Sequence, residues 1–144
     1  MAGFKRLILC LLGILISVAG FSQKNELTQK GNKVYVEGIS KNENSMEAVK
    51  ALRQELNEWG YWQVVSEKSK SDFTLKVDVK TSEGITLTSW GGTSYTLVGQ
   101  IVDKSDSVTW ESSQYKSSPN GTNGFNSGRA VVNKFVKALK KKYK

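Results

Sequence analysis

The sequence predicts an α+β two-layer sandwich, in which two helices cover one face of a mostly antiparallel sheet of four to five strands. Two segments have the single apolar stripe of an amphipathic helix, and several others alternate between apolar and polar residues. Short turns rich in glycine, serine and asparagine separate these segments. Because an apolar helix stripe has to be buried, a sheet with one apolar face is its natural partner. The expected order of elements is β-α-β-β-β-β-α.

The amino-terminal residues predict export. Lys5 and Arg6 precede an apolar run over residues 7–19, and small residues come just before Gln23. A positive start, a short apolar segment and a small-residue cleavage site are typical of a secretory signal peptide, here residues 1–22. The apolar run of about 13 residues is shorter than the ~20 of a membrane-spanning helix, so a retained anchor is the less favoured alternative. We therefore expect a periplasmic or extracellular protein that is not integral to the membrane after cleavage.

The predicted mature chain begins with a polar segment and continues into a helix. Residues 23–32 lack periodicity and are expected to be a flexible lead-in to a single domain over residues 33–144. Residues 33–39 have the composition of a first strand. Asn44 or Ser45 is expected to cap the following helix, and Gly60 to end it in the left-handed conformation. The apolar stripe of this helix consists of Ala48, Val49, Leu52, Leu56 and Trp59.

The second half of the chain is rich in strand patterns. The strictest alternation covers residues 73–79, with a turn expected over 81–84. Whether residues 82–94 form a hairpin or a loop is left open. The other strand candidates are 61–66, 85–90, 95–102 and 108–115. After a serine-rich loop, Asn126 or Ser127 is expected to cap a last helix with an apolar stripe made by Val131, Val132, Phe135, Val136, Ala138 and Leu139.

Composition limits the chemistry that the chain can perform. The sequence contains no histidine, and its one cysteine, Cys10, lies in the predicted signal peptide. The usual zinc sites are therefore excluded, and the commonest acid–base side chain is missing. We expect no catalytic residues, no metal and no cofactor. A carboxylate pair of the glycosidase type is the remaining enzymatic alternative. The net charge of +8 favours anionic partners.

Two stretches carry a resemblance to a known kind of module. Residues 52–62 end a helix in an aromatic turn, and residues 99–110 read as an apolar strand followed by a polar turn and a tryptophan. With the closing helix, this plan resembles the exported α/β modules at the amino end of the Tol-system protein TolB and in the curli-channel protein CsgG. The resemblance implies a non-catalytic envelope domain that docks onto proteins or assemblies.

The signal sequence and one turn also resemble those of a bacterial group. The ending Phe21-Ser22-Gln23 is similar to signal peptides of Bacteroidetes. Ser107, within Asp106-Ser107-Val108, is similar to sites that this group can O-glycosylate. An ordinary turn explains the same residues equally simply. Ser107 is therefore a candidate O-glycosylation site.

The candidate contact residues are aromatic and basic. Trp90 and Tyr95 flank a double glycine, and Tyr61 and Trp62 follow the first helix. Exposed aromatic residues are frequent anchors at protein interfaces, whereas Trp59 and Trp110 are expected in the core. An envelope protein is the expected partner, a glycan or an anionic lipid is the alternative, and no nucleic acid is expected. The candidate anion contacts are Lys137, Lys140, Lys141 and Lys142.

Overall fold

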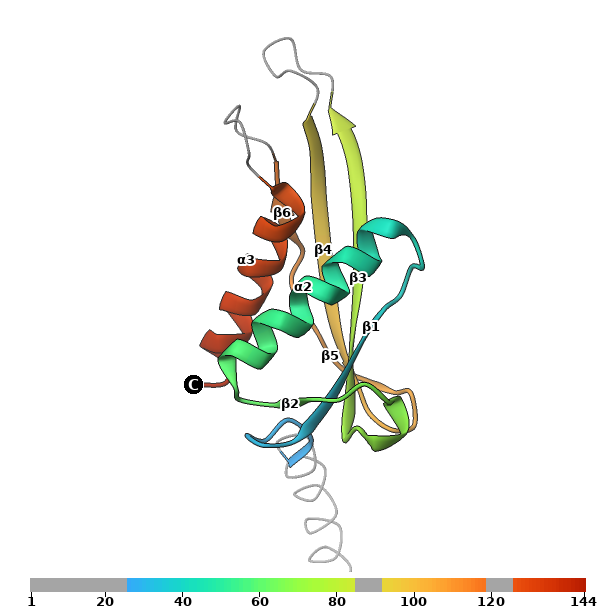
Figure 1. Cartoon of the computed structure of the whole chain (residues 1–144), viewed down its shortest axis with the longest axis vertical. Helices are drawn as coiled ribbons and strands as arrows, with labels where there is room; N and C mark the ends of the chain where they lie inside the picture. Colours follow the sequence, from blue (N-terminus) through green and yellow to red (C-terminus); the bar gives the residue numbers. More distant parts are fainter. Residues whose placement is uncertain (1–25, 85–91, 119–125) are drawn as a thin grey trace, which may run out of the picture.

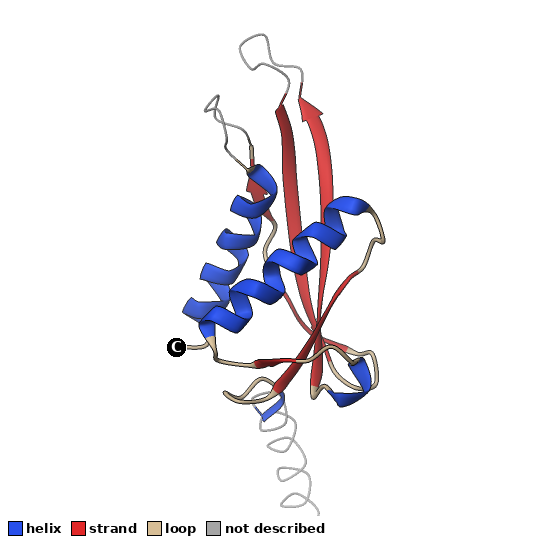
Figure 2. Ribbon diagram, viewed as in Figure 1, coloured by secondary structure: helices blue, strands red, loops and turns tan. Residues whose placement is uncertain are grey.

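The computed structural model describes residues 26–84, 92–118 and 126–144. Two long helices, α2 (Glu43–Trp59) and α3 (Ser127–Lys142), lie on the same face of a sheet (Figures 1 and 2). The strands are β1 (Lys33–Gly38), β2 (Gln63–Val64), β3 (Phe73–Gly84), β4 (Gly92–Val102), β5 (Val108–Glu111) and β6 (Tyr115–Ser117). Their order is β2-β1-β3-β4-β5, and β6 also pairs with β4. The predicted α+β two-layer class is confirmed.

The sheet is mixed, whereas the sequence led us to expect a mostly antiparallel one. β1 is parallel to both of its neighbours, with Val34 opposite Val64 in β2 and opposite Phe73 in β3. Parallel pairing needs a crossover connection, and α2 provides it between β1 and β2. The pairs β3–β4, β4–β5 and β4–β6 are antiparallel.

The longest hairpin, β3–β4, extends well past the end of β1. The expected turn at 81–84 is wrong, because β3 continues to Gly84, which pairs with Gly92 in β4. Residues 85–91, including most of the segment left open between hairpin and loop, lie outside the described residues. β1 ends where Gly38 faces Val77. Beyond this point, the outer edge of β3 has no strand partner among the described residues, and the hairpin projects past α2 (Figure 1).

Both helices have the capping residues that their sequences favour, with one shift in position. The Oδ1 of Asn42, rather than a group of Asn44 or Ser45, accepts a hydrogen bond from the backbone N–H of Ser45 at 2.8 Å. Ser45 is instead buried inside the first turn. Gly60 ends α2 with φ of 66°, as predicted. Asn126 caps α3 in the predicted way, accepting from the Arg129 N–H at 2.9 Å.

The core lies between the helices and the inner face of the sheet. Phe135 of α3 packs directly over Gly99 of β4, where a Cβ atom would overlap the phenylalanine ring. The glycine thus lets α3 approach the sheet closely. Most residues of the predicted helix stripes are buried as expected, whereas Val49, Trp59 and Ala138 are only half-buried. The fully buried side chains include Leu52, Leu56, Val131, Val132, Leu139, Val34, Val36, Leu75, Val77, Leu97 and Ile101.

Residues 26–32, which the sequence assigned to a flexible lead-in, pack against the domain. The Trp62 indole Nε1 donates a hydrogen bond to the Thr28 carbonyl at 2.9 Å, and the Gly31 N–H donates to the Tyr61 carbonyl at 2.7 Å. Leu27 packs against the core. Polar composition concealed these contacts, since they use backbone groups. Across the described ranges, no helix has the combined length and apolar character that crossing a membrane requires.

Candidate functional site

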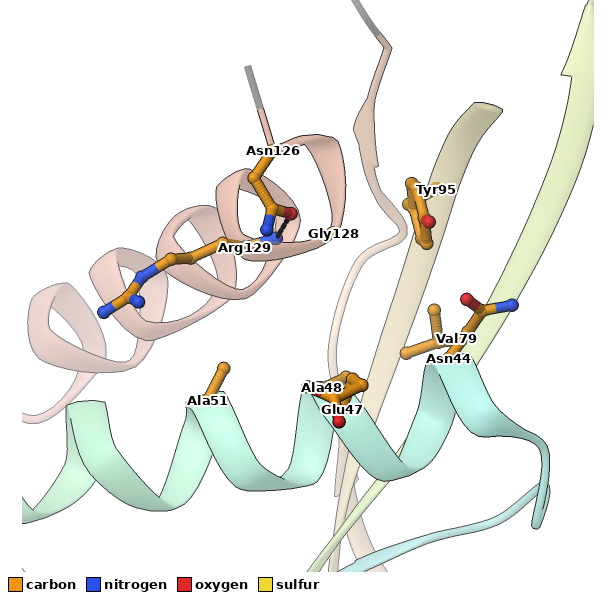
Figure 3. A pocket seen from close by; sticks show the side chains of 9 residues that line it. All are labelled: Asn44, Glu47, Ala48, Ala51, Val79, Tyr95, Asn126, Gly128 and Arg129. Atoms are coloured by element: carbon orange, nitrogen blue, oxygen red, sulfur yellow. Dashed lines mark hydrogen bonds between the residues drawn. The ribbon is translucent and has the colours of Figure 1, made fainter. Parts of the chain in front are cut away.

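A cleft opens between the amino-terminal halves of α2 and α3. The two helices lie close together near their carboxyl ends and diverge toward their amino ends (Figure 1). In this angle, a cleft of about 250 Å³ lies over β3 and β4 (Figure 3). The lining residues are Asn44, Glu47, Ala48, Ala51, Val79, Tyr95, Asn126, Gly128 and Arg129. We call this feature the cleft.

The cleft stays open because small residues face it from both helices. Ala48 and Ala51 line it from α2, and Gly128 lines it from α3. The buried side chain of Val79 and the half-buried ring of Tyr95 come from the underlying strands. The Tyr95 ring lies 3.5 Å from the place where a Cβ of residue 128 would stand. An aromatic ring thus forms one wall beside a helix backbone.

Two opposite charges belong to the lining of the cleft. Glu47 extends from α2 and Arg129 from α3, and both residues are exposed. Neither forms an ion pair within the described part of the chain. Next to Arg129, the Asn126 side chain is occupied by its capping hydrogen bond to the Arg129 N–H (Figure 3). The cleft therefore offers one carboxylate and one guanidinium to a binding partner.

The dimensions of the cleft favour side chains over whole ligands. Small-molecule sites are usually enclosed and occupy roughly 300–1,000 Å³, whereas this cleft is smaller and open to solvent. Over the described ranges, no three histidine, cysteine, aspartate or glutamate side chains form a group that could hold a metal ion. A pocket of this size accommodates one or two side chains of a protein, with apolar contact at Val79 and Tyr95.

The predicted aromatic contacts are divided between the two ends of the helical layer. Tyr95 lies in the cleft, while Tyr61 and Trp62 lie at the opposite end, beside the C-terminus of α2. Trp62 is only 3% exposed, so its ring is part of the core and unavailable to a partner. The sequence showed the cluster but not that residues 26–32 cover it. Trp90 lies outside the described residues.

The end opposite the cleft is a stacked aromatic cluster, defined by Trp59, Tyr61, Trp62, Phe73 and Tyr143. The rings of Trp59 and Tyr61 stack with centroids 4.8 Å apart, and Trp62 meets Tyr143 edge-on at 5.0 Å. Trp62 also meets Phe73 edge-on at 5.1 Å. Burial raises the pKa of the Tyr143 hydroxyl. These offset geometries are the preferred ones for aromatic pairs, and they fix the end of α2.

The predicted anion contacts all lie on α3. Lys137, Lys141 and Lys142 are exposed, and Lys140 is half-buried. The Lys142 ammonium lies 5.3 Å from the centroid of the half-buried Trp110 ring. A cation over a tryptophan face is an attractive pair, so this lysine is held close to the surface of the sheet.

Ser107 lies in an exposed turn organised by one carboxylate. The Oδ1 of Asp103 accepts hydrogen bonds from the Ser105 hydroxyl at 2.6 Å and from the Ser107 N–H at 3.0 Å. These bonds, the Ser105 hydroxyl first, lower the pKa of Asp103. Asp106 completes the turn with φ of 61°. The turn explains the sequence here, and glycosylation of Ser107 stays a prediction.

Sequence reasoning missed most of the cleft and a surface ion-pair network. Glu37 Oε1 lies 3.1 Å from Lys68 Nζ and 3.5 Å from Lys76 Nζ. The Asp106 carboxylate forms ion pairs with the same two lysines. The hydrogen bond to Glu37 raises the pKa of Lys68. Ala48 and Ala51, three residues apart on α2, were an available signal of the cleft, since small residues leave space beside a helix.

Comparisons with known proteins show the fold but no family. No protein-family model matches the sequence, and no curated protein is significantly similar to it. A dodecameric PelC variant from Paraburkholderia phytofirmans has a similar fold, with 15% identity, a TM-score of 0.56, and coverage of 76% of this chain and 90% of PelC. A Xanthomonas campestris protein of the family DUF330 shares 9% identity over 78% of this chain and 83% of its own, with a TM-score of 0.55.

A third similar structure is a hypothetical protein from Chlamydia trachomatis, with 10% identity, a TM-score of 0.54, and coverage of 76% of this chain and 95% of that chain. At these identities the likeness concerns the fold alone. The first two of these structures are a PelC and a DUF330 protein, so the likeness supports the α+β plan but does not support the TolB or CsgG modules. The α+β plan is retained, and the assignment to those two modules is not.

Proposed function

We propose that this protein is an exported, non-enzymatic envelope domain that binds a partner protein at the cleft. The observation that carries this proposal is the cleft itself. It combines an apolar floor at Val79, an aromatic wall at Tyr95 and the unpaired charges of Glu47 and Arg129 in a space of about 250 Å³. Such a pocket takes up one anchoring side chain of a partner, while the charges orient it.

The hairpin beside the cleft supports a protein partner. Past Val77, β3 has no strand partner on its outer edge in the described part of the chain. Lys80, Thr81 and Ser82 are exposed on this stretch. Charged and polar residues on a free edge discourage indiscriminate strand pairing, which leaves the edge to a partner that matches it.

The proposed location and class also have support outside the cleft. The basic start and short apolar run of residues 1–22 have the pattern of an export signal. PelC, a protein of similar fold, is described as a dodecamer, so this fold is compatible with assembly through protein contacts. The residues that line the cleft include no serine, cysteine or histidine, the usual nucleophiles and bases of hydrolases.

Site-specific photo-cross-linking in the native host tests the proposal. A photoreactive residue is placed at Glu47 or at Arg129, and the matched control positions are Asn57 and Asn133, which are exposed on the same two helices. We expect one envelope protein to be captured from the two cleft positions and not from the controls. Equal capture at all four positions, or capture at none, would contradict docking at the cleft.

A second candidate function, binding of an anionic envelope lipid or glycan, is favoured by the lysines of α3. Lys141 and Lys142 are exposed, and Lys142 lies over the Trp110 ring. Each basic residue near an anionic surface contributes about 1 kcal/mol. Sedimentation with phosphatidylglycerol vesicles, compared with phosphatidylcholine vesicles, tests it. Salt-sensitive binding that is lost on charge reversal of Lys141 and Lys142 supports this function, and equal sedimentation with both vesicles counts against it.

A further inference from the structure

We infer that the carboxyl-terminal end of α3 rests on an anionic membrane surface, with the half-buried rings beside it at the level of the lipid head groups. The cleft then points away from the membrane. This inference rests on the second candidate function, anionic binding by α3, and adds that the ligand is a lipid surface and which end of the protein meets it. Three features support it: the charge of α3, the rings beside it and the point at which the chain enters the domain.

The charges of α3 are all positive, and no carboxylate neutralises them. The helix contains Arg129 and five lysines but no aspartate or glutamate. None of these side chains forms an ion pair within the described part of the chain. The dipole of a helix places about half a negative charge at its carboxyl end, which a single lysine more than balances. Lys140, Lys141 and Lys142 in the last turn therefore leave an excess of positive charge there.

The neighbouring segments do not cancel this excess. The last turn of α2, which lies close to the carboxyl end of α3, contributes one carboxylate, that of Glu58 (Figure 1). In the lead-in, the exposed charges of Glu26 and Lys30 offset each other. Lys144, which is also exposed, adds a positive charge after the helix. A basic surface of this kind attracts anionic head groups within about one Debye length, roughly 8 Å at physiological ionic strength.

Two aromatic rings flank the last lysine of α3. The Lys142 ammonium lies 5.3 Å from the centroid of the Trp110 ring and 5.5 Å from that of the Tyr143 ring. Both aromatic residues are half-buried, so part of each remains exposed beside the charge. Tryptophan and tyrosine are enriched where a membrane meets water, because an apolar ring carries a polar tip. Glu111 does not oppose this arrangement, since strand alternation places its side chain on the other face of the sheet from Trp110.

The chain enters the domain at this same end. The carbonyl of Thr28 accepts the hydrogen bond from Trp62, whose ring meets that of Tyr143 at 5.0 Å. In the sequence, the apolar run over residues 7–19 ends shortly before Glu26. A segment that inserts into the membrane during export therefore delivers this end of the domain to the lipid surface. An anionic glycan as the ligand would explain the lysines but not this placement.

This orientation leaves the cleft accessible. α3 has 16 residues and is about 24 Å long at 1.5 Å per residue, and Arg129 lies near its amino end. The cleft lies beside that amino end, whereas the rings and lysines that meet the lipid lie at the other (Figure 1). A protein bound to the membrane in this way can still receive a partner in the cleft.

Sedimentation with vesicles tests the charge, with the protein purified as its native host exports it. Lys141→Glu combined with Lys142→Glu should weaken binding to phosphatidylglycerol vesicles by about thirtyfold or more, since each lysine near such a surface contributes about fivefold. The matched control makes the same charge change at Lys50 and Lys80, which are exposed on α2 and β3. It should weaken binding by about threefold or less. Equal losses would overturn the inference, because net charge alone would explain them.

Quenching by nitroxide-labelled head groups measures the orientation on the same vesicles. In a Cys10→Ala background, a fluorophore is attached at Asn57→Cys, near the carboxyl end of α2, or at Glu43→Cys at its amino end. Both positions are exposed, and they lie about 21 Å apart along the helix. We expect quenching at residue 57 to exceed quenching at residue 43 by about threefold or more, because nitroxide quenching needs close approach to the membrane surface.

The possible failures are distinguishable. Equal quenching at the two positions, with preference for phosphatidylglycerol retained, would overturn the orientation and leave anionic binding by α3 in place. Equal binding to phosphatidylglycerol and phosphatidylcholine would overturn both. Tight binding to soluble alginate without sedimentation on vesicles would overturn the inference in favour of a glycan.

Discussion

The aromatic cluster and the cleft lie at opposite ends of the same pair of helices, and they show two ways of using this layer. At the aromatic cluster, rings fill the angle where α2 and α3 meet, and Trp62 is hydrogen-bonded as well as buried. At the cleft, Ala48, Ala51 and Gly128 leave the angle between the helices unfilled. The aromatic cluster holds the helices to the sheet. Because the cleft is not needed to hold them there, it has space for a partner.

Truncation of one aromatic residue at each end gives the largest expected contrast. Trp62→Ala should lower the free energy of unfolding by about 3–5 kcal/mol, the usual cost of removing a buried large aromatic ring. Tyr95→Ala should cost about 1–2 kcal/mol, because its ring is only half-buried. Chemical denaturation of the two variants measures both values. Similar losses for the two variants would show that the cleft is also part of the structural core.

Substitution of two glycines by alanine sharpens the contrast between packed and open regions. Gly99→Ala forces a Cβ into the Phe135 ring and should destabilise the protein by about 1–3 kcal/mol. Gly128→Ala meets its nearest atoms at 3.4 Å or more, so it should stabilise α3 by up to about 0.5–1 kcal/mol. Thermal unfolding of both variants tests the opposite signs. A destabilised Gly128→Ala would mean that the cleft is already closely packed.

The cap at the rim of the cleft should contribute less than the packing at the aromatic end. Asn126→Ala removes the acceptor for the Arg129 N–H and should cost about 1 kcal/mol. Asn126→Asp is the control, because aspartate is an equally good cap and carries a charge that suits a helix N-terminus. The measurement is again denaturant unfolding. If the aspartate variant loses as much stability as the alanine variant, the cap is not the cause.

The smallest expected effect is the alkaline dependence of the aromatic cluster. Burial raises the pKa of Tyr143 above its ordinary value of 10.0, so the folded state holds this proton more tightly than the unfolded state. The resulting stability is fully present below pH 10 and is lost as pH rises through the pKa of the folded state. Unfolding measured across this range should show a small decline that Tyr143→Phe reduces. An unchanged decline in that variant would assign it to other groups.

The sequence predicted those elements whose residues carry a local pattern. The stripe that begins at Ala48 has the 3.6-residue period of α2, and the alternation from Phe73 to Val79 defines the face that β3 buries. Gly60 and Asn126 were identified because capping depends on a few neighbouring atoms. These features need no information from distant parts of the chain.

Other features depend on contacts between distant residues and were missed. Alternation in residues 33–39 defines a strand but not its neighbours, so the parallel placement of β1 was not foreseen. The cleft depends on the angle between two helices about seventy residues apart in sequence, which composition does not specify. The burial of Trp62 depends on Thr28, whose contribution comes from its backbone carbonyl.

The close contact of Phe135 with Gly99 has a consequence for the order in which the protein is made. α3 follows every strand of the sheet in the sequence, yet it provides the cover for the middle of β4. A chain that emerges amino end first therefore exposes the apolar surface of β4 that α3 covers until α3 has emerged as well. We therefore expect stable folding to wait until α3 has been translated, which is compatible with the export proposed above.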